Sequence, residues 1–258
     1  MDHDAAFAKR LAADMETEKT FVSLLIFVAI VLLDCLFLGV QSFGAFDNVS
    51  SVPLTAQNFS LFLLKEVSFF LVLIIGPILM IDSFNGEYHG GQLRLVLIRP
   101  ISILRLFAAK WINLAVILLL FVAVTFVIGE GAGHLLKPSV DSVVYLNPDR
   151  AYGPAGAFLY NLESYGLFML ILLAQLSVTA ALCTLLPSPI ICYLGWIGVA
   201  VGGLYVSDAL RFLLMGMSTV FQWMAGRYAH AFLLPVMVCI FLGFAVTMLW
   251  WNRRNWVK

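Results

Sequence analysis

Charged residues are scarce in this chain. Of its 258 residues, 12% are Asp, Glu, Lys or Arg, whereas 62% are hydrophobic, and the mean hydropathy is +0.98. A soluble domain is about a quarter charged and about half apolar. One water-soluble core cannot hide this excess of apolar side chains, so the composition predicts an integral membrane protein with several spans.

The sequence also lacks the short motifs of common enzymes. It contains no H-E-x-x-H metal motif, no G-x-S-x-G nucleophile motif and no G-x-x-x-x-G-K-[ST] phosphate loop. We therefore expect no enzymatic activity, no metal site and no cofactor on this chain. A nucleotide site, if one serves this protein, must lie on another polypeptide.

Cysteine and basic residues exclude two further classes. The four cysteines all lie inside apolar runs, where thiols behave as small hydrophobic groups rather than as a disulfide framework or a metal cluster. Basic residues form no stripe with interleaved aromatic residues, so a nucleic-acid partner is not expected.

Long apolar runs are abundant. Each is about 18–23 residues long, which is enough to cross roughly 30 Å of hydrocarbon as an α-helix. The sequence thus predicts an all-α membrane protein with six transmembrane helices, at residues 20–41, 59–81, 111–129, 164–186, 189–206 and 231–251. Residues 20–258 would form this transmembrane domain.

The segment 1–19 precedes the first span. Phe7, Leu11 and Met15 recur every four residues, and charged residues fill many of the positions between them. This pattern favours a cytoplasmic segment with an interfacial elbow helix. A solvated helix end is an equally good interpretation.

Lysine and arginine are distributed unevenly between the two sides. With the N-terminus inside, ten of them fall on inner segments and five on outer segments or outer helix ends. Because Lys and Arg resist translocation, this count predicts that both termini lie in the cytoplasm of a cell inner (plasma) membrane protein.

The segment 85–110 is the longest charged stretch between two spans. It holds Glu87, Arg94, Arg99, Arg105 and Lys110 between apolar runs on either side. We expect this basic linker to face the cell interior and to serve as a docking element.

The outer segment 207–230 is too apolar for a free loop, yet Gly216 and Gly226 interrupt it. Two short re-entrant helices dipping into the outer leaflet would explain this composition, because irregular backbone at membrane depth must be covered by protein.

Three ionisable residues fall inside predicted spans. Asp34 lies in the first span, and Lys65 and Glu66 lie at a similar depth in the second. A charge at that depth costs a few kcal/mol and needs a partner, and an Asp34–Lys65 pair is geometrically feasible if the two spans are neighbours. Two interpretations remain open: a polar wall along a substrate route, and a clamp between helices.

Two glycine motifs bear on helix geometry. Gly76-Pro77 in the second span predicts a kink, which would act as a hinge or be a fixed bend. Gly198-x-x-x-Gly202 in the fifth span predicts a close helix–helix approach.

The central segment resembles a known family. Glu87-x-x-x-Gly91-x-Leu93, followed by Arg99-Pro100, Ser102 and Lys110, is similar to the motif between the second and third spans of the ABC-2 permeases of ATP-binding-cassette transporters. The six-span layout also resembles that family. Gln92 stands where the family usually has Thr, and Ala109 where Gly often precedes the lysine.

The resemblance implies a permease subunit of an exporter. A coupling helix over 92–99 would dock on a separate ATPase, which would bind ATP and Mg. A second permease copy or a related chain would complete the route within the membrane lipid. The residues implied in ATPase coupling are Glu87, Gly91, Leu93, Arg94, Leu97, Arg99 and Pro100.

Two other functions fit the same residues. An ion-coupled secondary carrier would use Asp34, Lys65 and Glu66 as its coupling site. A non-transporting membrane scaffold would bind its ATPase and move nothing.

Overall fold

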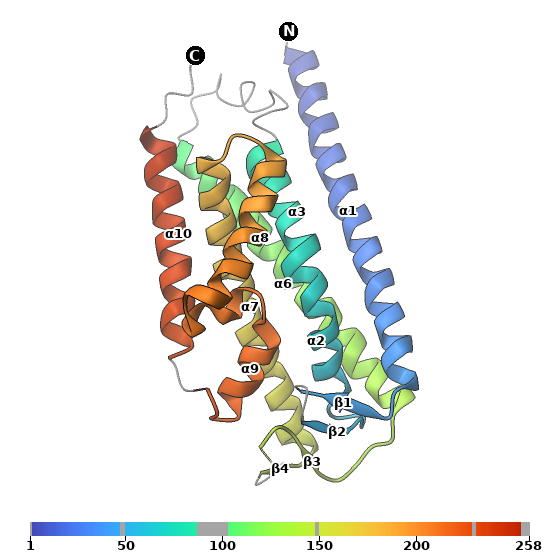
Figure 1. Cartoon of the computed structure of the whole chain (residues 1–258). Coiled ribbons are helices and arrows are strands. Elements are labelled where there is room, and N and C mark those ends of the chain that lie inside the picture. The colour runs from blue at the N-terminus through green and yellow to red at the C-terminus, as the bar shows by residue number, and fades with distance from the viewer. Residues whose placement is uncertain (1, 47–49, 87–102, 148–149, 229–230, 254–258) are drawn as a thin grey trace.

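The protein is described by a computed structural model that covers residues 2–46, 50–86, 103–147, 150–228 and 231–253 (Figure 1). Helices dominate the described residues. In chain order the elements are α1 (Asp2–Val40), β1 (Phe43–Ala45), β2 (Ser51–Pro53), α2 (Phe59–Phe70), η1 (Leu71–Ile75), α3 (Gly76–Ile81), η2 (Asp82–Gly86), α6 (Ile103–Leu136), β3 (Val143–Val144), β4 (Ala151–Tyr152), α7 (Pro154–Leu185), α8 (Pro189–Val206), η3 (Asp208–Leu213), α9 (Gly216–Met224) and α10 (Leu233–Arg253).

Six helical stretches in the described part are long and apolar enough to cross a membrane. They are Phe21–Val40, Phe59–Asn85, Leu104–Leu136, Pro154–Leu185, Pro189–Val206 and Leu233–Trp250. The predicted all-α, six-span architecture is confirmed at this level. It indicates a multi-pass membrane protein, because helices pair most backbone polar groups of a span internally.

Two helices extend well beyond the predicted spans. α6 has 34 residues and α7 has 32, so each is about 50 Å long. Hydropathy detects only the part of a helix that matches the hydrocarbon, about 30 Å. Much of the stretch 130–163 between the third and fourth predicted spans is therefore helical, and it lies outside the length that hydropathy detects.

The first helix is continuous. α1 runs without a break from Asp2 to Val40, so the segment predicted as an elbow continues the helix of the first span. Its location at a membrane interface stays a prediction.

The helices alternate in direction and define two ends of the bundle (Figure 1). We call the end where η2 finishes at Gly86, α6 begins at Ile103 and α10 finishes at Arg253 the segment end. The opposite end, with β1, β2, β3 and β4, is the hairpin end. Thus η2, which comes before 87–102 in the chain, finishes at the segment end, and α6, which comes after it, begins there.

Two antiparallel strand pairs close the hairpin end. β1 pairs with β2 so that Gly44 faces Val52, and β3 pairs with β4 so that Val144 faces Ala151. Phe46, just after β1, packs edge-on against Phe221 of α9 at a ring-centroid distance of 5.0 Å. The pair joins the first hairpin to the short helix before the last span.

α7 is the central helix. It is the most buried of the six spans and contacts the second span, α6, α8, α9 and α10. Its approach to α10 is close, because a Cβ added at Gly243 would lie 2.7 Å from the backbone carbonyl of Ser177. Glycine is needed there so that the two helices can touch.

A second close approach joins α6 to the region where α2 begins. A Cβ added at Gly129 would lie 2.9 Å from the Cα of Ser60, and one at Gly133 would lie 2.7 Å from the carbonyl oxygen of Ala56. Small residues four apart on both segments allow this contact.

The predicted approach at Gly198 and Gly202 is not formed with any part of the chain that the structure describes. Cβ atoms added at these two positions would meet nothing within 4 Å among the described residues. The spacing of small residues permits a close contact but does not say which helix faces them.

Candidate functional site

The predicted coupling residues lie outside the described part of the chain. Glu87, Gly91, Leu93, Arg94, Leu97, Arg99 and Pro100 all fall within 87–102. The structure does describe both flanks of that segment, and these flanks are held in a specific way.

The two flanks are hydrogen-bonded to each other and to the central helix. Lys110 Nζ in α6 donates to the carbonyl oxygen of Ser83 in η2 at 2.8 Å. One residue later, Trp111 Nε1 donates to Ser177 Oγ of α7 at 3.3 Å. Lys110, a basic residue of the predicted docking element, therefore joins the two flanks of 87–102.

The flank before the segment is also fixed to α7 and α8. The Asn85 side chain is buried, and its Nδ2 donates to Cys192 Sγ at 2.9 Å and to the carbonyl oxygen of Leu186 at 3.4 Å. Leu186 follows α7, and Cys192 lies in the first turns of α8. Asn85 thus ties η2 to the tight turn between these helices.

Aromatic rings complete the packing at the segment end. Phe84 of η2 lies 5.8 Å from Phe107 of α6, and Phe107 lies 5.2 Å from Phe244 of α10, measured between ring centroids. Trp111 meets Phe244 edge-on at 5.7 Å. We call the residues Ser83, Phe84, Asn85, Phe107, Lys110 and Trp111 the flank brace; it links both sides of 87–102 to α7, α8 and α10.

In the described part of the chain, Lys65 has partners other than Asp34. Lys65 Nζ donates to the carbonyl oxygen of Ala45 at 2.6 Å and lies 4.0 Å from Glu66 Oε1. The lysine extends toward the loop after the first helix, as amphipathic side chains do when a polar partner lies nearer the membrane surface. The Asp34–Lys65 pair that the sequence allowed is therefore not formed among the described residues.

Asp34 is left in an unusual position. Its Oδ2 is buried and has no hydrogen-bond partner among the described residues, and Glu66 is the neighbouring charge that acts on it. A buried carboxylate oxygen without a donor is costly unless the acid is protonated or a cation approaches.

The second span contains a π-helical turn directly before Gly76-Pro77, where the sequence predicts a kink. Leu71–Ile75 forms a π-helical turn, in which the Gly76 N–H donates to the carbonyl oxygen of Leu71. Pro77 has no N–H to offer the preceding turn. A Cβ at Gly76 would lie 2.4 Å from the Leu71 carbonyl oxygen, so this backbone path requires glycine.

Side chains of α7 and α8 satisfy the carbonyl groups that the π-turn releases. Val72 O accepts from Gln175 Nε2 at 2.8 Å and from Trp196 Nε1 at 3.2 Å, and Leu73 O accepts from Tyr193 Oη at 2.8 Å. We call this arrangement the π-turn clamp. π-turns are frequent at functional sites, and here three donors hold one in place.

The clamp residues were missed by sequence reasoning. Gln175 is a polar residue inside an apolar run, which is the one signal that could have singled it out. Tyr193 and Trp196 read as ordinary aromatic residues of the fifth span, because a sequence does not show which carbonyl group they face.

A second polar cluster, also missed, lies near the hairpin end. Asn161 Nδ2 donates to the carbonyl oxygen of Gln57 at 2.8 Å and to Glu130 Oε1 at 2.9 Å, and Asn161 Oδ1 accepts from Tyr145 Oη at 3.1 Å. Burial, with smaller effects from Tyr160, Glu130 and Tyr152, raises the pKa of Tyr145, so its hydroxyl stays a donor. The cluster fixes the start of the second span to α6 and α7.

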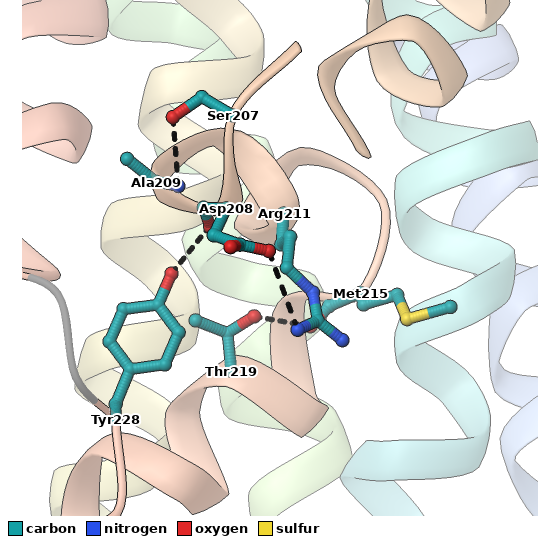
Figure 2. Close-up of polar contacts among 7 residues, drawn as sticks. All are labelled: Ser207, Asp208, Ala209, Arg211, Met215, Thr219 and Tyr228. Atoms are coloured by element: carbon teal, nitrogen blue, oxygen red, sulfur yellow. Dashed lines mark hydrogen bonds and ion pairs between the residues drawn. The ribbon is translucent and has the colours of Figure 1, made fainter. Parts of the chain in front are cut away.

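The short helices before the last span are tied together outside the spans. Figure 2 shows Tyr228 reaching back so that its Oη donates to the carbonyl oxygen of Asp208 at 2.7 Å, while Arg211 pairs with the Asp208 carboxylate at 3.8 Å. Ser207 Oγ accepts from the Ala209 N–H at 3.2 Å and caps η3. Two short helical segments, η3 and α9, thus occupy the predicted region, and their depth in a membrane stays a prediction.

Comparison with known families gives one match. Residues 25–195 match the family described as "Protein of unknown function (DUF2705)", which is more than half of the chain. The chain belongs to the DUF2705 family. No curated protein matches the sequence.

The extent of the DUF2705 match is informative. It contains Asp34, Lys65, Glu66, the flank brace and Gln175, and it stops one residue before Trp196. α9 and α10 lie beyond it. The family description names no activity, so function has to be argued from the residues of this chain.

Proposed function

We propose that this DUF2705 chain is the permease subunit of an ATP-driven exporter. The segment 85–110 would receive force from a separate ATPase subunit, which would carry ATP and Mg, and the six spans would form the translocation route. The resemblance of the Glu87–Lys110 segment to the ABC-2 motif is the sequence basis for this proposal.

The observation that carries the proposal is the flank brace. A segment that transmits force must be rigidly joined to the helices that move, since a free loop would absorb the displacement. Lys110 bonds Ser83 across the segment, while Asn85 and Trp111 bond α8 and α7. A push on 87–102 would therefore reach α7, α8 and α10 together.

The proposal includes an arrangement in the membrane. The segment end would face the cytoplasm, with both termini on that side, and the hairpin end would face outward. A second permease copy or a related chain would pair with this one. The excess of Lys and Arg in the segments assigned inside supports this orientation.

Purification from the native membrane tests the proposal. A tagged wild-type chain should bring down a nucleotide-binding subunit and ATP turnover in mild detergent. A Glu87→Ala/Arg94→Glu double variant should be recovered at equal yield without that subunit. If wild type brings down no ATPase under several mild detergents, the exporter proposal fails.

A second candidate is an ion-coupled carrier, and Asp34 is the observation that favours it. The buried Asp34 Oδ2 has no partner among the described residues, and Glu66 lies near it. A proton or a cation at this place would supply the missing partner.

The two candidates respond differently to energy sources. In sealed membrane vesicles, transport by an ion-coupled carrier should persist without ATP, stop on addition of an ionophore, and be lost in Asp34→Asn. Transport by the exporter should require ATP and survive the ionophore.

A further inference from the structure

Thr179 differs from the other buried threonines within the helices. Thr125 donates to the carbonyl oxygen of Phe121 at 2.9 Å, Thr219 to that of Met215 at 2.9 Å and Thr247 to that of Gly243 at 2.7 Å, each four residues earlier. This is the usual way in which a threonine inside a helix satisfies its hydroxyl. Thr179 lies fully buried in the C-terminal third of α7, and its hydroxyl makes no hydrogen bond within the described residues.

A second unpaired oxygen lies on the same face of α7. Gln175 is one turn before Thr179, and residues four apart on a helix are neighbours. Gln175 is 1% exposed, and its Oε1 also lacks a partner in the described part of the chain. Its other end is fixed, because Nε2 donates to Val72 O in the π-turn clamp.

Exchanging the positions of Nε2 and Oε1 in the Gln175 amide does not give Oε1 a hydrogen-bond donor. A flip would point Oε1 at the carbonyl oxygen of Val72, placing two acceptors together and losing the 2.8 Å bond. The unpaired acceptor is therefore a consequence of the clamp. Buried polar groups are rarely left without a partner, and ordered water commonly supplies one.

We propose that Gln175 Oε1 and Thr179 Oγ1 bind one buried water molecule beside the π-turn. The water donates one hydrogen to Gln175 Oε1 and shares a hydrogen bond with the Thr179 hydroxyl. Two oxygens are too few for the six or more ligands that a hard cation prefers, whereas they suit a water molecule. This site is independent of whether the chain belongs to an ATP-driven exporter.

The water gives the clamp an exchangeable partner. Val72 O depends on Gln175 and Trp196 because the π-turn withholds the backbone donor. When the bend at Gly76-Pro77 changes, the Gln175 amide must find another partner within the low-dielectric interior. A water already held at its carbonyl end supplies that partner, so the second span can bend without leaving a polar group unpaired.

Solid-state NMR of the full chain in lipid bilayers tests the site. With the side-chain amide of glutamine labelled, the Gln175 signal is assigned by its disappearance in Gln175→Met. Magnetisation transfer from water to this amide is then measured. We expect a clear transfer in wild type, retention in Thr179→Ser, which keeps the hydroxyl, and loss in Thr179→Val.

The matched control is Thr125→Val. Thr125 is equally buried but bonds its own helix, so removing its hydroxyl should leave the Gln175 water signal unchanged. Absence of transfer to Gln175 in wild type, while solvent-accessible glutamine amides show it, would overturn the proposal. Equal transfer in wild type and Thr179→Val would overturn it as well.

Discussion

Replacing Gly243 by alanine tests the packing on which the brace depends. A Cβ at this position would lie 2.7 Å from the carbonyl carbon and oxygen of Ser177 and 3.0 Å from its Cβ. These are mostly backbone atoms of a central helix, so no flexible side chain can move aside. α10 has to shift away from α7, and Phe244 and Trp111 beside it lose their fit.

The expected magnitude follows from two opposing effects. Adding a methyl group to a well-packed contact costs about 1–3 kcal/mol. Replacing glycine by alanine inside a helix returns up to about 1 kcal/mol through helix propensity. At Gly166 and Gly198 an added Cβ meets nothing within 4 Å, so the propensity gain remains alone. Gly243→Ala should therefore be less stable than Gly198→Ala by about 1–3 kcal/mol.

Thermal or SDS-induced unfolding in one detergent provides the assay. The three alanine variants are compared with wild type, and Gly198→Ala and Gly166→Ala should equal or exceed it. Equal stability of Gly243→Ala and Gly198→Ala would refute the close approach of α10 to α7.

Four further predictions use the same unfolding measurement. Gly76→Ala should destabilise by about 1–3 kcal/mol, because its Cβ meets the π-turn carbonyl oxygen of Leu71; wild-type stability would argue against the π-turn. Asn161→Leu should leave its buried partners without hydrogen bonds, at a cost of about 1–3 kcal/mol for each group. Asn161→Asp should cost at least as much, because its carboxylate would face Glu130 Oε1 and the carbonyl oxygen of Gln57; wild-type stability of both variants would argue against the cluster. Lys137→Met should lower the free energy of unfolding by about 0.5–1 kcal/mol, since the Lys137 ammonium donates to the carbonyl groups of Gly39 and Gln41 at the end of α1. Unchanged stability would show that these hydrogen bonds do not stabilise the protein. Asp34→Asn should be as stable as wild type or more so, because a buried oxygen without a donor gains nothing from negative charge; marked destabilisation would reveal a partner for the carboxylate.

Hydropathy predicted the spans but could not predict their full helices. Apolar runs located all six, because the bilayer demands apolar side chains over a fixed length. Hydropathy missed the ends of α6 and α7, because helical residues outside the hydrocarbon need not be apolar.

Pairing between helices was the least predictable feature. Asp34 and Lys65 lie at similar depths, yet the lysine bonds the carbonyl oxygen of Ala45, which a sequence cannot place. Gly76-Pro77 marked the position of an irregular turn, while the donors that complete it, such as Gln175, come from helices about a hundred residues away. Local signals identify local geometry, and partners depend on the tertiary fold.

Photo-crosslinking from the central segment tests the exporter proposal most directly. A photoreactive amino acid replaces Leu97 in the native membrane, and a matched chain carries it at Leu249, which is 60% exposed on α10 near the segment end. We expect an adduct from position 97 with a polypeptide that contains a phosphate-binding loop, and no adduct with that polypeptide from position 249. Crosslinks from position 97 only to lipid, or to a chain without a nucleotide site, would contradict the exporter proposal.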